Sequence, residues 1–198
     1  MKYVKSMIRL VITGNPGVGK HTSAEFIAEK IQGIKIIDIN KFAIEKNAIL
    51  NRDRKYGIDV DVKKLSKLID YELRTTTKDF AIIGHLAPYV LKRSRINFVV
   101  VLRRSPYELM KTLEQRKYSL EKTRENVASE ILGVSLYDAL KTFGKDKIVE
   151  LDTTAKTPEY IAGEIMLVIQ RGGSGKIGIV DWLSLVYKKG DLRNFLEY

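Results

Sequence analysis

One nine-residue segment, GNPGVGKHT at residues 14–22, limits the folds open to this chain more than any other. It approaches the pattern G-x-x-x-x-G-K-[ST], whose backbone N–H groups surround phosphate oxygens while the lysine supplies a positive charge. An apolar run at residues 7–13 precedes the segment, and apolar residues at helical spacing follow it. A strand, a glycine-rich turn and a helix in this order predict a nucleotide phosphate site.

The residue after the lysine departs from this pattern. His21 stands where a Ser or Thr hydroxyl ordinarily binds Mg²⁺. Imidazole is a poor ligand for this hard ion, and its charged form is disfavoured at a helix N-terminus. We therefore expect a neutral His21 that donates a hydrogen bond to phosphate or packs beside it, while the Thr22 hydroxyl remains available to the metal.

The rest of the chain alternates short apolar runs with amphipathic stretches. Strands are expected at residues 7–13, 34–39, 79–86, 96–102 and 147–152. Helices are expected at residues 20–31, 62–74, 123–143 and 158–171, and from residue 106 onward. This alternation predicts an α/β fold of the P-loop NTPase type, in which a five-stranded parallel sheet lies between two helical layers.

The composition changes after residue 171. Residues 172–178 read GGSGKIG, which is typical of a flexible linker, and an apolar patch around Trp182 follows. We expect one domain over residues 1–171 and a C-terminal extension over residues 172–198 that packs onto it. The alternative is that the extension docks onto a partner.

The composition also limits the classes of function. The chain has 198 residues and no cysteine, which excludes disulfides, zinc fingers and a thiol nucleophile. Its net charge of +11 favours a polyanionic partner such as nucleic acid or a ribonucleoprotein, although a heat-adapted, lysine-rich surface fits equally well. No apolar run reaches the length of a signal peptide or membrane span, so a soluble cytoplasmic protein without membrane contact is expected.

Two segments carry a resemblance to a known family. GNPGVGKHT resembles the loop of adenylate kinases, in which glycine commonly follows the lysine and threonine comes next. Residues 99–131 are similar to the adenylate kinase-like ribosome-assembly factors of archaea and eukaryotes. The matching positions are Val101-Leu102-Arg103, Arg116-Lys117-Tyr118, Lys122 and Glu125-Asn126. Over residues 7–171 the resemblance implies a nucleoside-monophosphate-kinase-like fold, with a monophosphate-binding region at about residues 38–61 and a short lid at about residues 115–125.

The resemblance also implies roles for individual residues. Lys20 and Arg116 are expected to be catalytic, with Arg116 closing over the ATP phosphates. Without the resemblance, the charges around Arg116 would indicate only a solvated helix face. Arg103 is expected at a strand end where nucleotide-binding residues gather. The residues expected to hold ATP are Gly14, Gly17, Val18, Gly19, Lys20, His21, Thr22, Arg103 and Arg116.

Two positions near the third strand and the second strand leave alternatives open. The eukaryotic members of the family have an Asp-x-His here, whereas this chain has Ile83 in place of the Asp and keeps the histidine as His85. His85 is therefore either a catalytic residue or a packed histidine. Asp38 either holds Mg²⁺ through water, together with Thr22, or caps the next helix.

The acceptor region departs from the kinase pattern. Ile44 stands where many adenylate kinases place an arginine for the AMP phosphate. Lys41, Arg52, Arg54 and Arg93 are alternative sources of positive charge, and the sequence does not choose among them.

The resulting hypothesis is an enzyme that uses ATP and Mg²⁺. It is a broad-specificity nucleoside monophosphate kinase (ATP + AMP to 2 ADP) with ATPase activity. The resemblance implies a role in late maturation of the small ribosomal subunit and its rRNA, with a platform protein of that subunit as partner. The alternatives are an assembly ATPase with little kinase activity and a P-loop kinase of another small metabolite.

Overall fold

The computed structural model describes residues 7–53, 57–173 and 175–196. The strands are β1 (Arg9–Thr13), β2 (Lys35–Asp38), β3 (Ile49–Asp53), β4 (Gly57–Val60), β5 (Phe80–Ile83), β6 (Phe98–Arg103) and β7 (Ile148–Asp152). The helices are α1 (Lys20–Lys30), α2 (Ile39–Glu45), α3 (Val62–Thr75), α4 (Ala87–Val90), α5 (Pro106–Gln115), α6 (Leu120–Ile131), α7 (Val134–Phe143), α8 (Pro158–Gln170), α9 (Trp182–Lys188) and α10 (Leu192–Leu196). Two 3₁₀ turns, η1 (Arg93–Arg95) and η2 (Lys145–Lys147), complete the elements of these ranges.

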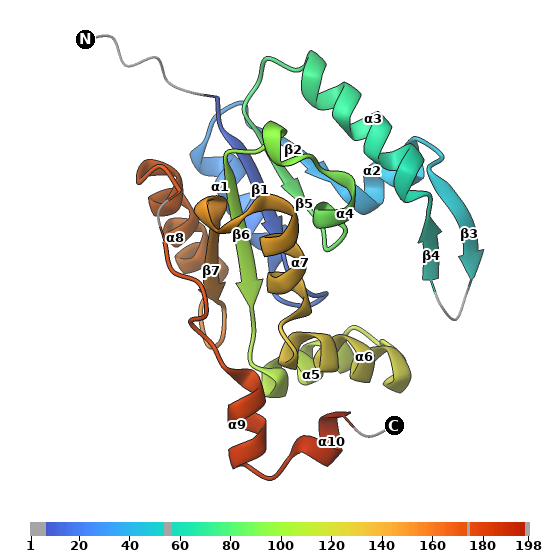
Figure 1. The fold of residues 1–198 in the computed structure, drawn as a ribbon, viewed down its shortest axis with the longest axis vertical. Helices are drawn as coiled ribbons and strands as arrows, with labels where there is room; N and C mark the ends of the chain where they lie inside the picture. The colour runs from blue at the N-terminus through green and yellow to red at the C-terminus, as the bar shows by residue number, and fades with distance from the viewer. Residues whose placement is uncertain (1–6, 54–56, 174, 197–198) are drawn as a thin grey trace.

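A five-stranded parallel sheet in the order β2-β5-β1-β6-β7 forms the centre of the molecule (Figure 1). The middle strand β1 pairs with β5 and β6 and is buried from Leu10 to Thr13. Its side chains alternate between faces, so Leu10 and Ile12 enter one hydrophobic cluster and Val11 the other. The predicted parallel α/β sheet is confirmed.

Helices cover both faces of the sheet. Apolar residues of α1, α5, α6 and α8 form one cluster with the sheet, and those of α2, α3, α4 and α7 form the other. A separate antiparallel pair, β3 and β4, lies beyond α2 and α3 (Figure 1). Within the described ranges, no helix has both the length and the apolar character needed to cross a bilayer.

Two expected elements end earlier than predicted. The helix expected at residues 123–143 is two helices, α6 and α7, because Gly133 adopts φ of +69° between them. The strand expected at residues 79–86 ends at Ile83. Gly84 follows at φ +155°, and a Cβ atom there would lie 2.9 Å from Cβ of Ile39. His85 therefore lies in a turn before α4 rather than in the strand.

Residues 175–196 pack onto the domain. Trp182, Val186 and Phe195 are buried and belong to the same cluster as α1 and α8. Figure 1 shows α9 and α10 (red) beneath α5 and α6, and both helices contact α6. The C-terminal extension is thus part of the hydrophobic core on this side of the sheet.

Candidate active site

The glycine-rich loop turns sharply at the carboxyl end of β1. Gly14 has φ of +134°, and a Cβ atom there would lie 2.4 Å from the carbonyl oxygen of Leu102. Gly19 has φ of +101° and directly precedes α1. Only glycine adopts such a backbone without strain, and the turn places the N–H groups of the first helical turn beside the pocket.

Lys20 is buried at the first position of α1. Its ammonium group donates hydrogen bonds to the backbone carbonyl oxygens of Gly14 (2.9 Å) and Asn15 (2.8 Å). Burial and the positive charge of Arg116 lower the pKa of Lys20 to about 8, although two carboxylates act in the opposite direction. An anion bound in this loop would relieve the repulsion between the two cations.

His21 contacts a carboxylate at the end of the neighbouring β2. Its Nε2 lies 2.6 Å from Oδ2 of Asp38. The other oxygen of Asp38 accepts hydrogen bonds from the backbone N–H groups of Asn40 (2.9 Å) and Lys41 (3.1 Å), and so caps α2. Burial alone would raise the Asp38 pKa, but the hydrogen bonds from His21 and from α2 lower it overall, which keeps the carboxylate ionised.

Asp38 and Thr22 line the same pocket and offer oxygen atoms to a divalent cation. Mg²⁺ commonly keeps several waters and uses one or two protein ligands together with substrate phosphates. The described residues contain no group of three or more His, Cys, Asp and Glu side chains that would hold a metal ion without a nucleotide. Asp38 and Thr22 could thus supply one or two oxygen ligands to Mg²⁺, which would take its other ligands from water and a bound phosphate.

The two residues after Lys20 are expected to differ in their tolerance of substitution. The His21 side chain is 54% exposed, and its hydrogen bond is with Asp38. H21G should therefore change the rate of ATP turnover by less than about fivefold. T22A removes one of the two candidate oxygen ligands for Mg²⁺ and should lower the rate by about tenfold or more. Steady-state rates of ATP turnover at saturating Mg²⁺ are compared for the two variants. A larger loss of rate in H21G than in T22A would assign the larger role to His21.

A pocket of about 660 Å³ lies above the carboxyl ends of β1, β2 and β5. This volume is within the range of small-molecule sites, and the carboxyl edge of an α/β sheet is where such sites form. Its lining includes Asn15, Gly17, Gly19, Lys20, His21, Thr22, Asp38, Asn40, Ile58, Asp59, Val60, His85, Tyr89, Arg116, Tyr118, Lys122, Asn126, Ser129 and Asp138. The pocket thus reaches from the glycine-rich loop to β4 on one side and to α6 on the other.

Arg116 enters this pocket from the turn between α5 and α6. It follows the last residue of α5, and Ser119 begins the next helix by accepting a hydrogen bond from the N–H group of Lys122 (3.2 Å). Both Arg116 and Lys122 are exposed and line the pocket opposite the loop. Arg116 has no ion-pair partner among the residues that the structure describes, so its charge is available to a ligand.

His85 lies in the turn before α4 and lines the same pocket as Lys20 and Lys122. Desolvation and the positive charges of Lys20 and Lys122 lower the pKa of His85 to about 4. A histidine with this pKa is neutral at physiological pH. It can donate one hydrogen bond to a phosphate oxygen, but it does not add a positive charge.

We expect His85 to titrate near pH 4 in a proton NMR experiment, with H21G used to assign the signals of the two histidines. An unfolded histidine binds a proton near pH 6.5, so the unfolded chain binds more protons between these pH values. The contribution of His85 to stability therefore decreases as the pH falls from about 6.5 to 4. K122A should raise the midpoint, whereas a midpoint near 6.5 in the unchanged protein would contradict this arrangement.

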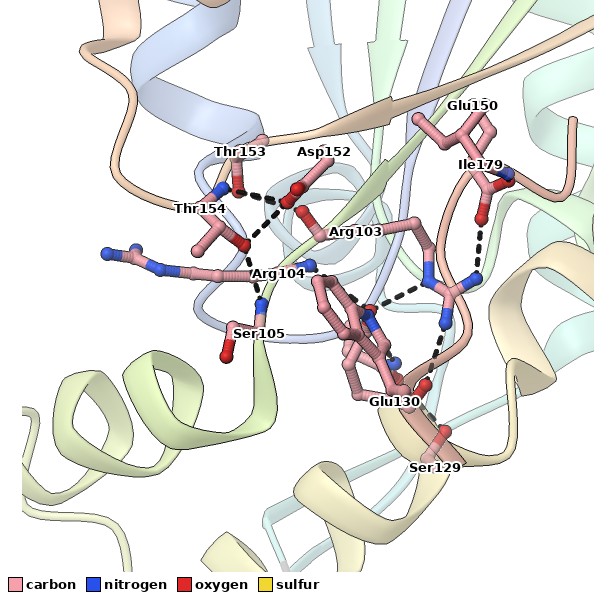
Figure 2. Close-up of polar contacts among 12 residues, drawn as sticks. Arg103, Arg104, Ser105, Ser129, Glu130, Glu150, Asp152, Thr153, Thr154 and Ile179 are labelled. Atoms are coloured by element: carbon pink, nitrogen blue, oxygen red, sulfur yellow. Dashed lines mark hydrogen bonds and ion pairs between the residues drawn. The ribbon is translucent and has the colours of Figure 1, made fainter. Parts of the chain in front are cut away.

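Three of the residues expected to contact ATP lie outside the pocket lining. Gly14 shapes the loop, and Val18 is fully buried in the core. Arg103 is 3% exposed, and its guanidinium donates to Glu130 (2.7 Å) and Glu150 (2.6 Å), as Figure 2 shows. The donors of Arg103 are thus occupied by buried carboxylates and the residue does not line the pocket, so its expected contact with ATP stays a prediction.

The candidates for holding an acceptor phosphate are not gathered in the pocket. Arg93 lies outside the lining and forms an ion pair with Asp146 (2.8 Å). Lys41 also lies outside it, while Arg54 and the side chain of Arg52 lie outside the described residues. The choice among these cations stays open.

The sequence interpretation missed several polar residues of the pocket. Tyr89 of α4 donates a hydrogen bond to Asp138 of α7, which raises the pKa of Tyr89 to about 12. Asn15 donates to Glu130 (2.6 Å) and accepts from Ser129 (3.0 Å). Asn15 could have been recognised from its place inside the loop, whereas no local pattern marks Asp138 on an otherwise ordinary helix.

The chain is similar to known proteins over most of its length. A family profile described as "AAA domain" matches residues 10–133. The chain is 35% identical over 173 residues to the "Putative adenylate kinase" of Thermococcus kodakarensis, covering 87% of this chain and 92% of that protein. It is 34% identical over 176 residues to the protein of the same name from Methanocaldococcus jannaschii, covering 88% and 93%.

Solved structures share the fold. A shikimate kinase from Bacteroides thetaiotaomicron superposes with a TM-score of 0.57 at 14% identity, covering 83% of this chain and 99% of that chain. A gluconokinase from Sinorhizobium meliloti gives 0.52 at 18% identity, covering 83% and 92%. At these identities the similarity shows the P-loop NTPase fold alone. The identity to the archaeal relatives over most of both chains shows the family. The chain belongs to the adenylate kinase-like family of P-loop kinases.

Proposed function

We propose that this protein transfers the γ-phosphoryl group of ATP to a nucleoside monophosphate, with AMP as the reference acceptor, and slowly hydrolyses ATP when no acceptor is bound. One observation carries the proposal. Lys20 and Arg116 come from different elements, face one pocket, and lie close enough for Arg116 to lower the pKa of Lys20. Two cations held together in this way favour a polyphosphate between them.

Each pocket residue then has a role in an in-line transfer that needs no covalent intermediate. Lys20 stabilises the bridging region between the β- and γ-phosphates, and Arg116 stabilises charge on the transferred group. Asp38 and Thr22 would hold Mg²⁺, which neutralises phosphate charge when bound. His85 is neutral and donates a hydrogen bond rather than a proton, because its pKa is about 4.

The pocket has room for an acceptor beside the phosphate loop. Ile58, Asp59 and Val60 of β4 form its far wall, within the region where the monophosphate was expected. Tyr89 and Asp138 close the side next to His85. Apolar and polar groups together suit a nucleotide acceptor, and we propose that the enzyme accepts several nucleoside monophosphates.

A panel of nucleoside monophosphates tests this proposal. Each is incubated with ATP, Mg²⁺ and the protein, and nucleotides and inorganic phosphate are quantified together. We expect diphosphate formation to exceed hydrolysis with at least AMP. Acceptor-independent hydrolysis across the whole panel would instead favour an ATPase, and transfer to a non-nucleotide metabolite would favour the third hypothesis.

We further propose that the enzyme acts in late maturation of the small ribosomal subunit, in contact with a platform protein and the precursor rRNA. The resemblance of residues 99–131 to assembly factors and the net charge of +11 support this role. We expect small-subunit components to co-purify with the protein at low and physiological salt. Absence of precursor rRNA and of any small-subunit protein under both conditions would contradict the role.

A further inference from the structure

Trp182, the first residue of α9, is linked to the phosphate loop through one buried carboxylate. Its indole Nε1–H donates to Oε1 of Glu130 (3.1 Å). Glu130 is fully buried in α6, and its Oε2 accepts a hydrogen bond from the side-chain amide of Asn15 (2.6 Å). The backbone carbonyl of Asn15 in turn accepts from the ammonium group of Lys20 (2.8 Å). Three hydrogen bonds therefore connect the C-terminal extension with the loop lysine.

The C-terminal extension supplies hydrogen bonds that this charge cluster needs. Arg103 lies between Glu130 and Glu150, so one guanidinium serves two buried carboxylates (Figure 2). Buried charges are stable only when their remaining oxygens are hydrogen-bonded. The extension provides donors to both carboxylates, from the indole of Trp182 to Glu130 and from the backbone N–H of Ile179 to Glu150 (2.9 Å).

The extension is also fixed at its far end. The hydroxyl of Tyr107 in α5 donates to Asp191 (2.6 Å), and the ring of Phe195 lies edge-on to Tyr107 at 5.1 Å. Because both ends are attached, Trp182 is held at a defined place relative to Glu130. The indole is therefore a rigid partner of the carboxylate rather than a loosely packed side chain.

We infer that Trp182 is a positioning residue for nucleotide binding, which acts through Glu130 on Asn15 and so keeps the phosphate loop in its binding conformation. The indole is one of three donors to Oε1 of Glu130, beside Nε of Arg103 (2.7 Å) and the backbone N–H of Arg104 (3.1 Å), and it completes the set that orients the carboxylate. That carboxylate orients Asn15, whose carbonyl groups hold Ser129 and Lys20. The inference rests on the proposed function only in that ATP binds at this loop, whatever the acceptor is.

W182F tests the inference in the full chain, because phenylalanine keeps most of the apolar contact and removes the donor. Affinity for a non-hydrolysable ATP analogue with Mg²⁺ is measured by calorimetry. We expect about tenfold weaker binding, the size of loss typical when a residue that orients a binding group is removed. This readout does not depend on phosphoryl transfer, so failure of the kinase proposal leaves it interpretable.

V186A is the matched control, because Val186 is buried in the same helix but is not part of the hydrogen-bonded chain to Asn15. It should lower thermal stability at least as much as W182F and leave analogue binding within about twofold of the unchanged protein. N15A should also weaken binding of the analogue. The double variant W182F/N15A should bind little more weakly than N15A alone, because both substitutions act on the position of Asn15.

Three results would overturn the inference. The first is W182F binding the analogue within about twofold of the unchanged protein. The second is a full additive loss in the double variant W182F/N15A, since independent effects would show that Trp182 does not act through Asn15. The third is a W182F protein that does not fold while V186A folds and binds normally, which would reduce Trp182 to a packing residue.

Discussion

Replacement of Lys20 by alanine is expected to reduce both phosphoryl transfer and ATP hydrolysis by about 10³-fold, the upper end of the effect of removing one preorganised donor to the transferring group. The ammonium group donates to the backbone carbonyl oxygens of Gly14 and Asn15. Its position is therefore fixed before the nucleotide binds. A loss of this size corresponds to about 4 kcal/mol of transition-state stabilisation.

The same substitution should leave the fold intact. Burial disfavours the charged form of Lys20 and lowers its pKa to about 8. K20A removes this unfavourable burial of charge together with two hydrogen bonds, so its two effects on the free energy of unfolding oppose each other. K30A is the matched control, because Lys30 is exposed at the other end of α1. Initial rates and thermal unfolding of K20A and K30A are compared, and K20A activity within tenfold of the control would show that the site lies elsewhere.

Replacement of Arg116 by alanine is expected to reduce the turnover number by about 10²- to 10³-fold, with a smaller effect on the Michaelis constant for ATP. The guanidinium lies in the turn between α5 and α6, exposed and facing Lys20, where it can stabilise charge that develops on the transferred group. R116K should recover only part of the rate, because an ammonium group lacks the planar pair of donors.

The control substitution for R116A lies on α5, the helix that precedes Arg116. Lys111 is exposed on α5 and lies outside the pocket lining, so K111A should change the turnover number by less than about twofold. Neither substitution should alter thermal stability by more than a few degrees, since both side chains are exposed. An equal effect of R116A and K111A would indicate a general effect of charge and would remove Arg116 from the catalytic residues.

The strongest sequence patterns predicted the fold because each arises from a local physical requirement. The apolar run at residues 96–102 corresponds to β6, which is buried on both faces as a central parallel strand must be. The glycine-rich loop predicted the turn after β1, because its positive φ values require glycine. These features depend on residues close together in the chain.

The features that the sequence did not predict depend on distant residues. Arg103 at a strand end fits a nucleotide contact as well as a buried ion pair, and its partners Glu130 and Glu150 are 27 and 47 residues away. The break at Gly133 was missed, since a single glycine is also tolerated inside a helix. The β3–β4 pair was missed because its short strands carry several charged residues and little alternation.

The most direct test of the proposed phosphoryl transfer is an experiment with ATP that carries a radiolabelled γ-phosphate, together with unlabelled AMP and Mg²⁺. Lys20 and Arg116 line one pocket, and we propose that they hold the γ-phosphate within reach of an acceptor bound there. The label should therefore appear in ADP formed from AMP, faster than in inorganic phosphate, and K20A should abolish both products. Label that appears in inorganic phosphate alone, at a rate that AMP does not change, would contradict this mechanism.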